Sequence, residues 1–292
     1  MDVLVQIIAS GLTLGAMYAV STIGLALVYG ALNMLNMAHG AVLALGGYVC
    51  FYAMSVLGLP AMAGVAAAAV VCGGVGLGIY HLAARPMLKS AGFETRIFIA
   101  TIGIGAVLEN VILRLFGPQP KAQPLNIAGA LHIGNVSIPL QNVLILAVAL
   151  AMMAGVAWLL GRTRTGRAIR ATAQNREAAQ LMGVRIGRVY AQVLALSGAL
   201  AAISGIMISS LAGLLPNVGA DPMLKAFVIC VVAGLGQVRG AVLAALVLGL
   251  LEAAIQFAVG VQYSFAILLV IVIGVLIWRP YGFFGRSQVV RL

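Results

Sequence analysis

The chain has 292 residues, of which 63% are hydrophobic and only 8% charged, and its mean hydropathy is +1.13. A soluble domain carries roughly 25% charged residues, so the composition excludes an ordinary soluble protein and indicates one that lies in a lipid bilayer. The formal net charge is +11, but the basic residues fall in short segments between long apolar runs, which excludes nucleic acid as a partner.

Long apolar runs predict transmembrane helices. No Asp, Glu, Lys or Arg occurs between Val3 and Ala84, and because about 20 apolar residues cross a bilayer, this stretch alone holds about three crossings. The runs are continuous rather than alternating, which excludes a membrane β-barrel. We therefore predict an all-α, polytopic integral membrane protein of about eight to ten transmembrane helices, organised as a single transmembrane domain over residues 1–292.

The apolar runs and the turn residues between them place the crossings. They are expected near residues 3–31, 34–57, 60–84, 97–116, 141–161, 189–214, 218–238, 240–259 and 261–278. The apolar stretch 223–238 is short for a bilayer at about 1.5 Å per residue. A broken or re-entrant helix is therefore an alternative to a full crossing at that place.

Polar residues interrupt the first apolar region at Asn33, Asn36 and His39, followed by Gly40. They follow one another by three or four positions, so a continuous helix would present them on one face. Alternatively, Gly30 and Gly40 bracket a break whose exposed backbone groups contact a solute, as in broken transporter helices. Polar residues at membrane depth often line a transport path, but they also join neighbouring helices by hydrogen bonds. Both interpretations stay open, and the four residues are candidates for a solute path.

Two carboxylates, Glu109 and Glu252, also interrupt apolar runs. An intramembrane carboxylate is compatible with proton coupling. Glu109 lies close to Arg114 in the sequence, however, and both acids fall toward the ends of predicted crossings. We favour structural roles for both.

The cysteines and histidines do not form a metal-binding pattern. Cys50, Cys72 and Cys230 sit inside apolar runs without metal or redox spacing. The three histidines fall in unrelated segments of the chain. We therefore expect no metal ion and no cofactor in this chain, and packing roles for the cysteines.

The distribution of basic residues predicts the orientation of the crossings. Segments 85–96, 162–188 and 279–292, together with Arg239, lie on one side of the predicted membrane and hold 14 of the 17 Lys and Arg residues. By the positive-inside rule this side is the cytoplasm. The loop 117–140 is then outside.

The segment 162–188 contains seven arginines. Each arginine costs about 2.5 to 3.5 kcal/mol at mid-membrane, so this segment does not cross. Alanines such as Ala168 and Ala171 recur at helical spacing, with Met182 continuing the apolar side and arginines between them, which predicts a short amphipathic helix over 166–183. A simpler interpretation is an orientation signal facing anionic lipid.

Within this helix, Glu177-Ala178-Ala179 followed by Gly183 resembles the EAA-three residues-Gly motif of ABC importer permeases, whose cytoplasmic helix docks in a groove of the ATPase subunit. The Leu-Pro ending of the usual motif is absent. The resemblance implies ATPase-coupling roles for Arg167, Arg170, Glu177, Ala178, Ala179 and Gly183.

The resemblance extends over nearly the whole chain. Residues 11–48 resemble the opening of the branched-chain amino acid ABC transporter permeases, although Met37 replaces the usual Phe and Ala41 replaces an acid. The matching positions are Gly11, Leu12, Leu14, Gly15, Tyr18, Ala19, Gly24, Tyr29, Gly30, Asn36, Ala38, His39, Gly40 and Tyr48. Segments 164–184 and 224–243 resemble the cytoplasmic loop and the Lys-Ala-Phe segment of the same family.

This family resemblance implies a permease subunit in the bacterial inner membrane that forms the path for branched-chain amino acids. It implies a second related permease, two ABC ATPase subunits that use ATP-Mg, and a periplasmic solute-binding protein as partners. Members of the wider family also import urea, amides, aromatic acids and sugars.

The chain itself contains no G-x-x-x-x-G-K-[ST] phosphate loop, so we expect it not to be an ATPase. A secondary carrier or channel for a small solute is the alternative, which the basic amphipathic segment disfavours. An integral-membrane enzyme is disfavoured because no catalytic constellation is evident.

Overall fold

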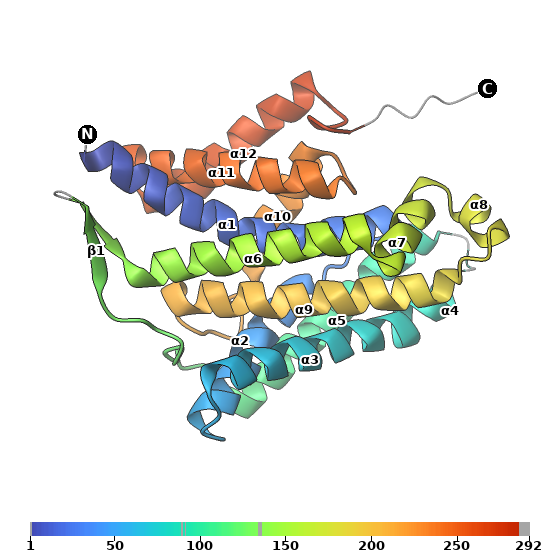
Figure 1. Ribbon diagram of the computed structural model, residues 1–292, viewed down its shortest axis with the longest axis horizontal. Helices are drawn as coiled ribbons and strands as arrows, with labels where there is room; N and C mark the ends of the chain where they lie inside the picture. The colour runs from blue at the N-terminus through green and yellow to red at the C-terminus, as the bar shows by residue number, and fades with distance from the viewer. Residues whose placement is uncertain (1, 89, 91, 134–135, 286–292) are drawn as a thin grey trace.

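The computed structural model of the chain describes residues 2–88, 90, 92–133 and 136–285 (Figure 1). In chain order its elements are α1 (Asp2–Leu32), α2 (His39–Ser55), α3 (Ala61–Ile79), the π-helical turn η1 (Tyr80–Ala84), α4 (Arg85–Met87), α5 (Phe93–Phe116), β1 (Ala130–Ile133), β2 (Val136–Pro139), α6 (Leu140–Arg162), α7 (Arg164–Gln174), α8 (Arg176–Leu181), α9 (Ile186–Ala212), α10 (Ala220–Ala233), α11 (Val238–Val259) and α12 (Val261–Trp278). The predicted helical membrane protein is confirmed.

Among the described residues, seven helical segments are long and apolar enough to cross a bilayer: α1, α3 continued through η1 and α4, α5, α6, α9, α11 and α12. Of the shorter helices, α2 has 17 residues and α10 has 14, and both pack within the bundle. At about 1.5 Å per residue, α10 is roughly 21 Å long, less than the hydrocarbon core of about 30 Å. The helix in this stretch is therefore too short for a full crossing by itself, in line with the length argument, and a re-entrant path stays a prediction.

The expected crossings 34–57 and 218–238 are therefore wrong in extent. The first begins late because residues 33–38 form a turn rather than helix. The second ends early because Gly234 has a φ of +97°, a left-handed conformation that stops the helix and that glycine adopts without a Cβ penalty.

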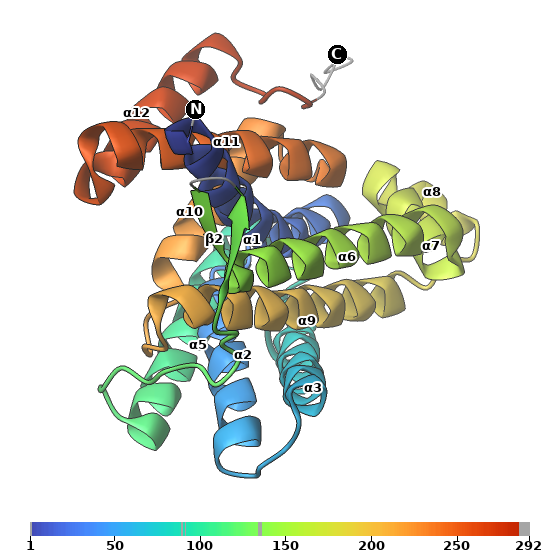
Figure 2. The same cartoon turned by 60° about the vertical axis from the view of Figure 1, so that its left-hand side comes forward.

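The helices pack around α1 and α9. α1 contacts α6, α9, α10 and α11, while α9 contacts α2 and α3, and α5 lies against α2. Figure 1 shows the long helices running side by side, and Figure 2 shows α3 and α12 at opposite edges of the bundle. Helices α6 and α12 are the least enclosed of the long helices, which leaves most of their apolar surface for lipid or partners.

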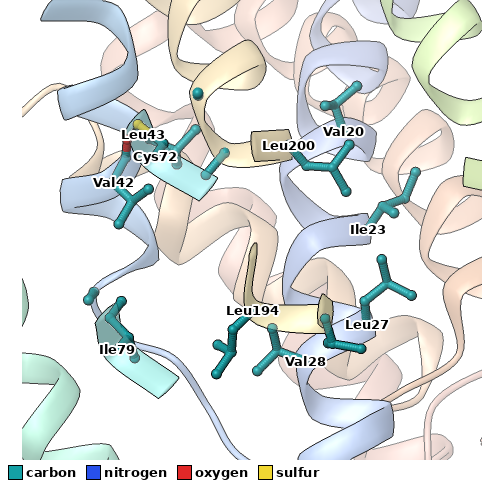
Figure 3. Close-up of a cluster of buried hydrophobic side chains, with 14 of the residues drawn as sticks. Val20, Ile23, Leu27, Val28, Val42, Leu43, Cys72, Ile79, Leu194 and Leu200 are labelled. Atoms are coloured by element: carbon teal, nitrogen blue, oxygen red, sulfur yellow. Dashed lines mark hydrogen bonds between the residues drawn. The ribbon is translucent and has the colours of Figure 1, made fainter. Parts of the chain in front are cut away.

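Buried apolar side chains from four helices form the centre of the bundle (Figure 3). The residues labelled there are Val20, Ile23, Leu27 and Val28 of α1, Val42 and Leu43 of α2, Cys72 and Ile79 of α3, and Leu194 and Leu200 of α9. All three cysteines are buried, which agrees with the packing role expected from the sequence. The Cys72 thiol lies 3.6 Å from the Val42 carbonyl oxygen.

Glycines allow this close packing. A Cβ added at Gly198 of α9 would collide with the Cys72 carbonyl of α3, and one added at Gly205 would collide with the Leu43 carbonyl of α2. The two glycines are seven residues apart, so both lie on nearly one face of α9. Small residues that bring helix backbones together are a usual means of helix association in membranes.

The two ends of the bundle differ. At one end, β1 and β2 form an antiparallel hairpin in which Leu131 pairs with Ile138, an element that the sequence analysis did not predict because four-residue strands carry too little pattern. At the other end lie α7 and α8 (Figures 1 and 2). This separation agrees with the prediction that the loop 117–140 and the segment 162–188 face opposite sides of the membrane.

Candidate functional site

The chain breaks between α1 and α2, at residues 33–38. The continuous-helix interpretation is therefore wrong, and the break between Gly30 and Gly40 is confirmed. Asn33 turns the chain with a φ of +51°, and it is the one non-glycine residue with positive φ among those described. Asparagine tolerates this conformation better than most residues. The Asn36 side-chain oxygen then accepts a hydrogen bond from the Ala38 N–H at 3.2 Å.

A neighbouring helix supports the break. The Thr101 hydroxyl of α5 accepts a hydrogen bond from the Met37 N–H at 3.1 Å and lies 3.4 Å from the Leu35 carbonyl oxygen. Thr101 is fully buried. Unpaired backbone groups at membrane depth are costly, so Thr101 stabilises the break. Sequence reasoning missed this residue, whose signal is a single threonine within an apolar run.

His39, the first residue of α2, lies inside the bundle. It is 1% exposed, and its Nε2 lies 3.3 Å from the Ser21 hydroxyl of α1. A Cβ added at Gly24 would lie 3.0 Å from the His39 ring and 3.2 Å from the Ser197 hydroxyl of α9. His39 therefore joins α1 and α2 in tight packing beside α9.

Gly40 brings two short helices together. A Cβ at Gly40 would lie 2.7 Å from the Gly219 carbonyl oxygen, and one at Gly219 would collide with the Gly40 carbonyl. The starts of α2 and α10 therefore meet backbone to backbone. Neither position has room for a side chain.

A narrow cleft lies between the break and α10. Of the four predicted path residues, Asn36 alone contributes to its lining. The full lining is Leu25, Tyr29, Leu35, Asn36, Met37, Met223, Phe227, Cys230 and Leu235. Its volume is about 10 Å³, roughly the space that one water needs. The cleft is therefore closed to a solute the size of an amino acid.

A buried ion pair ties α10 to its neighbours. The Lys225 ammonium lies 2.7 Å from Glu252 Oε1 of α11 and 3.1 Å from Asp221 Oδ2 of α10, and it donates to the Tyr18 hydroxyl of α1 at 3.1 Å. Gln256 donates to Glu252 at 3.1 Å. Glu252 therefore joins α11 to α10 through Lys225, which is a structural role of the kind expected from the sequence. Sequence reasoning missed this pairing, because Lys225 and Glu252 lie 27 residues apart on different helices.

Glu109 has a different setting. It is partly exposed and lines a cleft of about 300 Å³ with Asn110 of α5 and Asn217 of the loop before α10. Among the described residues, the ion pairs within 4.0 Å all involve Lys225, so Glu109 and Arg114 do not form one. This cleft therefore presents a carboxylate and two amides.

The arginine-rich segment forms two helices instead of the one predicted over 166–183. Asn175 separates α7 from α8, with a backbone φ of −157°, and its side-chain oxygen accepts a hydrogen bond from the Ala178 N–H at 2.9 Å. Asparagine is among the strongest N-cap residues, so it starts a new helix here. This local capping explains why the predicted continuous helix is wrong.

One side of this segment packs against the bundle. Ile169 and Thr172 of α7 and Ala179 of α8 are buried, and the Arg176 guanidinium of α8 lies 5.6 Å from the Tyr190 ring centroid of α9. Arg167, Arg170, Glu177 and Ala178 are exposed on the outside. The predicted amphipathic character of the segment is confirmed.

The tip of α8 carries two exposed apolar side chains that the sequence analysis did not single out as contacts. Leu181 is 88% exposed and Met182 is 85% exposed. The sequence pattern put Met182 on the apolar side of one continuous helix over 166–183. The break at Asn175 divides this helix, and Met182 is exposed beside Leu181. Two adjacent apolar residues projecting from a polar segment are typical of a contact surface.

Gly183 ends α8 by a backbone requirement. Its φ is +84°, and the N–H groups of Gly183 and Val184 donate to the Gln180 and Ala179 carbonyls. This is a Schellman motif, in which glycine takes the left-handed position. The glycine thus fixes where Leu181 and Met182 point.

In the part of the chain that the structure describes, seven bilayer-length helices, two short helices that meet at a helix break, and an exposed amphipathic segment at one end define a multi-pass membrane protein. A family model described as "Branched-chain amino acid transport system / permease component" matches residues 7–278. The chain belongs to this family, and is an ABC transporter permease.

Similar proteins support the assignment. The chain is 32% identical, over 98% of its length and 97% of the relative, to the high-affinity branched-chain amino acid transport system permease protein BraD of Pseudomonas aeruginosa. It is 30% identical, over 97% of its length and 96% of the relative, to the corresponding permease protein LivH of Escherichia coli K12. A shorter match, 34% identical over 35% of this chain and 31% of the relative, is to the autoinducer 2 import system permease protein LsrC of Yersinia pseudotuberculosis.

Proposed function

We propose that the chain forms the translocation path of an importer for branched-chain amino acids in the bacterial inner membrane. A second homologous permease subunit completes the path, two separate ABC ATPase subunits hydrolyse ATP-Mg, and a periplasmic solute-binding protein delivers the solute. The support for the solute class is the near full-length similarity to permeases whose names state branched-chain amino acid transport. The whole chain acts as one permease domain in this proposal.

The same proposal includes docking of the α7–α8 segment on an ATPase subunit, which couples ATP hydrolysis to movement of the spans. The observation that supports this docking is the apolar tip formed by Leu181 and Met182. The rest of the segment is held to the bundle by buried residues such as Ile169 and Ala179, so a force applied at the tip reaches the spans. An ATPase groove that accepts both apolar side chains gains roughly 1.5–3 kcal/mol for each one fully buried. Arg167, Arg170 and Glu177 then lie at the rim, where single exposed ion pairs contribute about 0–1 kcal/mol.

We place the solute path beside the break and α10. Asn36 lines the closed cleft, while His39 and Gly40 hold the break in shape by their packing, and Asn33 turns the chain into it. Movement of α10 away from Met37 opens the cleft. The Glu109 carboxylate in the larger cleft suits a solute that carries an ammonium group, such as an amino acid, better than an aromatic acid without one.

The test is a double substitution at the tip, Leu181→Ser with Met182→Ser, in the complex reconstituted into proteoliposomes. We expect loss of solute-stimulated ATP hydrolysis and weaker co-purification of the ATPase, with normal accumulation in the membrane. Leu131→Ser is the matched control, because Leu131 is an exposed apolar residue at the opposite end of the bundle. Normal coupling in the double variant, or transport by the purified chain without any ATPase, contradicts the proposal.

The solute class is tested separately. Uptake of labelled leucine through the complete complex is measured in competition with valine, urea, an aromatic acid and a sugar. Competition by valine alone supports the branched-chain assignment. Competition by urea or an aromatic acid assigns the chain to one of the alternative import classes.

A further inference from the structure

A cavity of about 440 Å³, wide open to the protein surface, lies where α3 ends and α9 begins. Its lining consists of Tyr80, His81, Arg85, Arg185, Ile186, Gly187, Arg188 and Ala191. Figure 1 shows α3 and α9 side by side, with these ends on the side of the bundle that carries α7 and α8. This cavity lies outside both the helix break and the α8 tip, so neither proposal above assigns it a role.

The π-helical turn Tyr80–Ala84 shapes one wall. In an α-helix, residues five apart point about 140° away from each other, at roughly 100° per residue. Here the Arg85 N–H donates to the Tyr80 carbonyl, so the wider turn places Tyr80 and Arg85 one above the other, and both line the cavity. Single π-helical turns often mark functional sites.

The Tyr80 hydroxyl faces this cavity without a partner. Tyr80 is 6% exposed, and no hydrogen bond joins its hydroxyl to any other described residue. A Cβ at Gly187 would lie 2.9 Å from this hydroxyl, so the absence of a side chain at Gly187 keeps the space in front of it open. The Tyr80 ring is thus largely buried while its hydroxyl reaches solvent through the cavity, so the hydroxyl is available to donate a hydrogen bond to a ligand or to water.

The other walls are basic. Arg85, Arg185 and Arg188 are exposed, and among the described residues none has a carboxylate within 4.0 Å, since those ion pairs all involve Lys225. The N–H groups of Ile186 and Gly187, at the start of α9, also have no acceptor among described residues. Arginine side chains, helix N-terminal N–H groups and a hydroxyl are together the donors that bind phosphate.

The surroundings of the cavity are those of a membrane surface. Leu82, in the same π-helical turn, is 81% exposed, and Leu77 of α3 is 39% exposed. These apolar residues offer a surface for acyl chains directly beside the basic cavity. Basic pockets between transmembrane helices on the cytoplasmic side bind anionic lipid head groups.

We propose that this cavity binds the phosphate head group of an anionic phospholipid, with Arg85, Arg185 and Arg188 as its counter-ions and Tyr80 as a hydrogen-bond donor. The acyl chains lie along Leu77 and Leu82. The bound lipid joins the end of α3 to the start of α9, next to the segment that leads back from α8. The inference does not depend on which solute the transporter carries.

The test is native mass spectrometry of the purified full-length chain, titrated with phosphatidylglycerol and, separately, with zwitterionic phosphatidylcholine. We expect phosphatidylglycerol to bind more tightly. Each arginine near the membrane surface is worth about a fivefold change in affinity, so Arg85→Gln with Arg188→Gln is expected to weaken phosphatidylglycerol binding about 25-fold. Tyr80→Phe is expected to weaken it less.

The matched control is Arg162→Gln with Arg239→Gln, which removes the same charge from exposed arginines that do not line the cavity. Equal loss in the control, or equal affinity for the two lipids, overturns the proposal because only general charge attraction is then at work. Displacement of the lipid by millimolar inorganic phosphate shows a free-phosphate site and overturns the lipid assignment. Unchanged lipid binding with loss of the ATPase from the complex assigns the arginines to partner docking and also overturns it.

Discussion

The helix break and the α7–α8 segment satisfy their polar groups in opposite ways. At the break, one local hydrogen bond joins Asn36 and Ala38, but the other partners come from other helices: the Met37 N–H donates to Thr101 of α5, and His39 lies within hydrogen-bond distance of Ser21 of α1. In the α7–α8 segment, partners are local: Thr163 caps α7 and Asn175 caps α8. A substitution at the break is therefore expected to disturb packing as well as transport, whereas one on the outside of α8 is expected to disturb coupling alone.

The largest effect is expected from Lys225→Met. This change leaves Glu252 buried without its counter-ion, and breaking a buried ion pair by removing one partner costs roughly 3–5 kcal/mol. We expect a much lower unfolding temperature and poor accumulation of the protein in the membrane. Adding Glu252→Gln to the variant is expected to recover part of the stability, because no unpaired buried charge then remains. Equal stability of the single variant and the unaltered chain would contradict the role given to the pair.

A smaller loss is expected from His39→Ala at the break. The substitution leaves the Ser21 hydroxyl unpaired inside the bundle, which costs about 1–3 kcal/mol. Transport is expected to fall together with thermal stability. Asn36→Ala is the comparison, because Asn36 lines the cleft: there, we expect uptake to fall more than stability does. If His39→Ala lowers uptake while stability is unchanged, His39 contacts the solute path directly.

Two neighbouring alanines on α8, Ala178 and Ala179, are expected to respond differently to substitution by tryptophan. Ala178 is exposed and Ala179 is 5% exposed, so Ala178→Trp is expected to change stability by no more than about 0.5 kcal/mol. Solute-stimulated ATP hydrolysis is expected to fall at least tenfold, a factor that corresponds to about 1.4 kcal/mol of coupling. Ala179→Trp is expected to lower both quantities because its ring does not fit against the bundle. Identical behaviour of the two variants would refute the orientation of α8.

The smallest effect is expected from Arg170→Ala. Arg170 is exposed, and a single exposed ion pair contributes about 0–1 kcal/mol. We expect ATP hydrolysis and uptake to change less than threefold, with a further decrease as salt is lowered below physiological strength, where the missing charge matters more. A loss as large as that of Ala178→Trp would show that charge, rather than shape, governs docking.

The spans and the position of the α7–α8 segment could be predicted from the sequence. Each apolar run of about 20 residues must satisfy its backbone within its own helix, so hydropathy alone locates it. Likewise, seven arginines in 162–188 cannot enter the hydrocarbon core. The shortness of the helix in 223–238 followed from the same length argument.

Tertiary structure alone decided how these pieces meet. Lys225 and Glu252 are 27 residues apart in the sequence and lie on different helices. Thr101 is 64 residues from Met37, whose N–H donates a hydrogen bond to it. No local sequence pattern predicts either pair. Whether residues 33–38 continue a helix or break it depended on such distant acceptors. The outward direction of Leu181 and Met182 was also beyond local periodicity, because the buried side of α8 is set by its packing against α9.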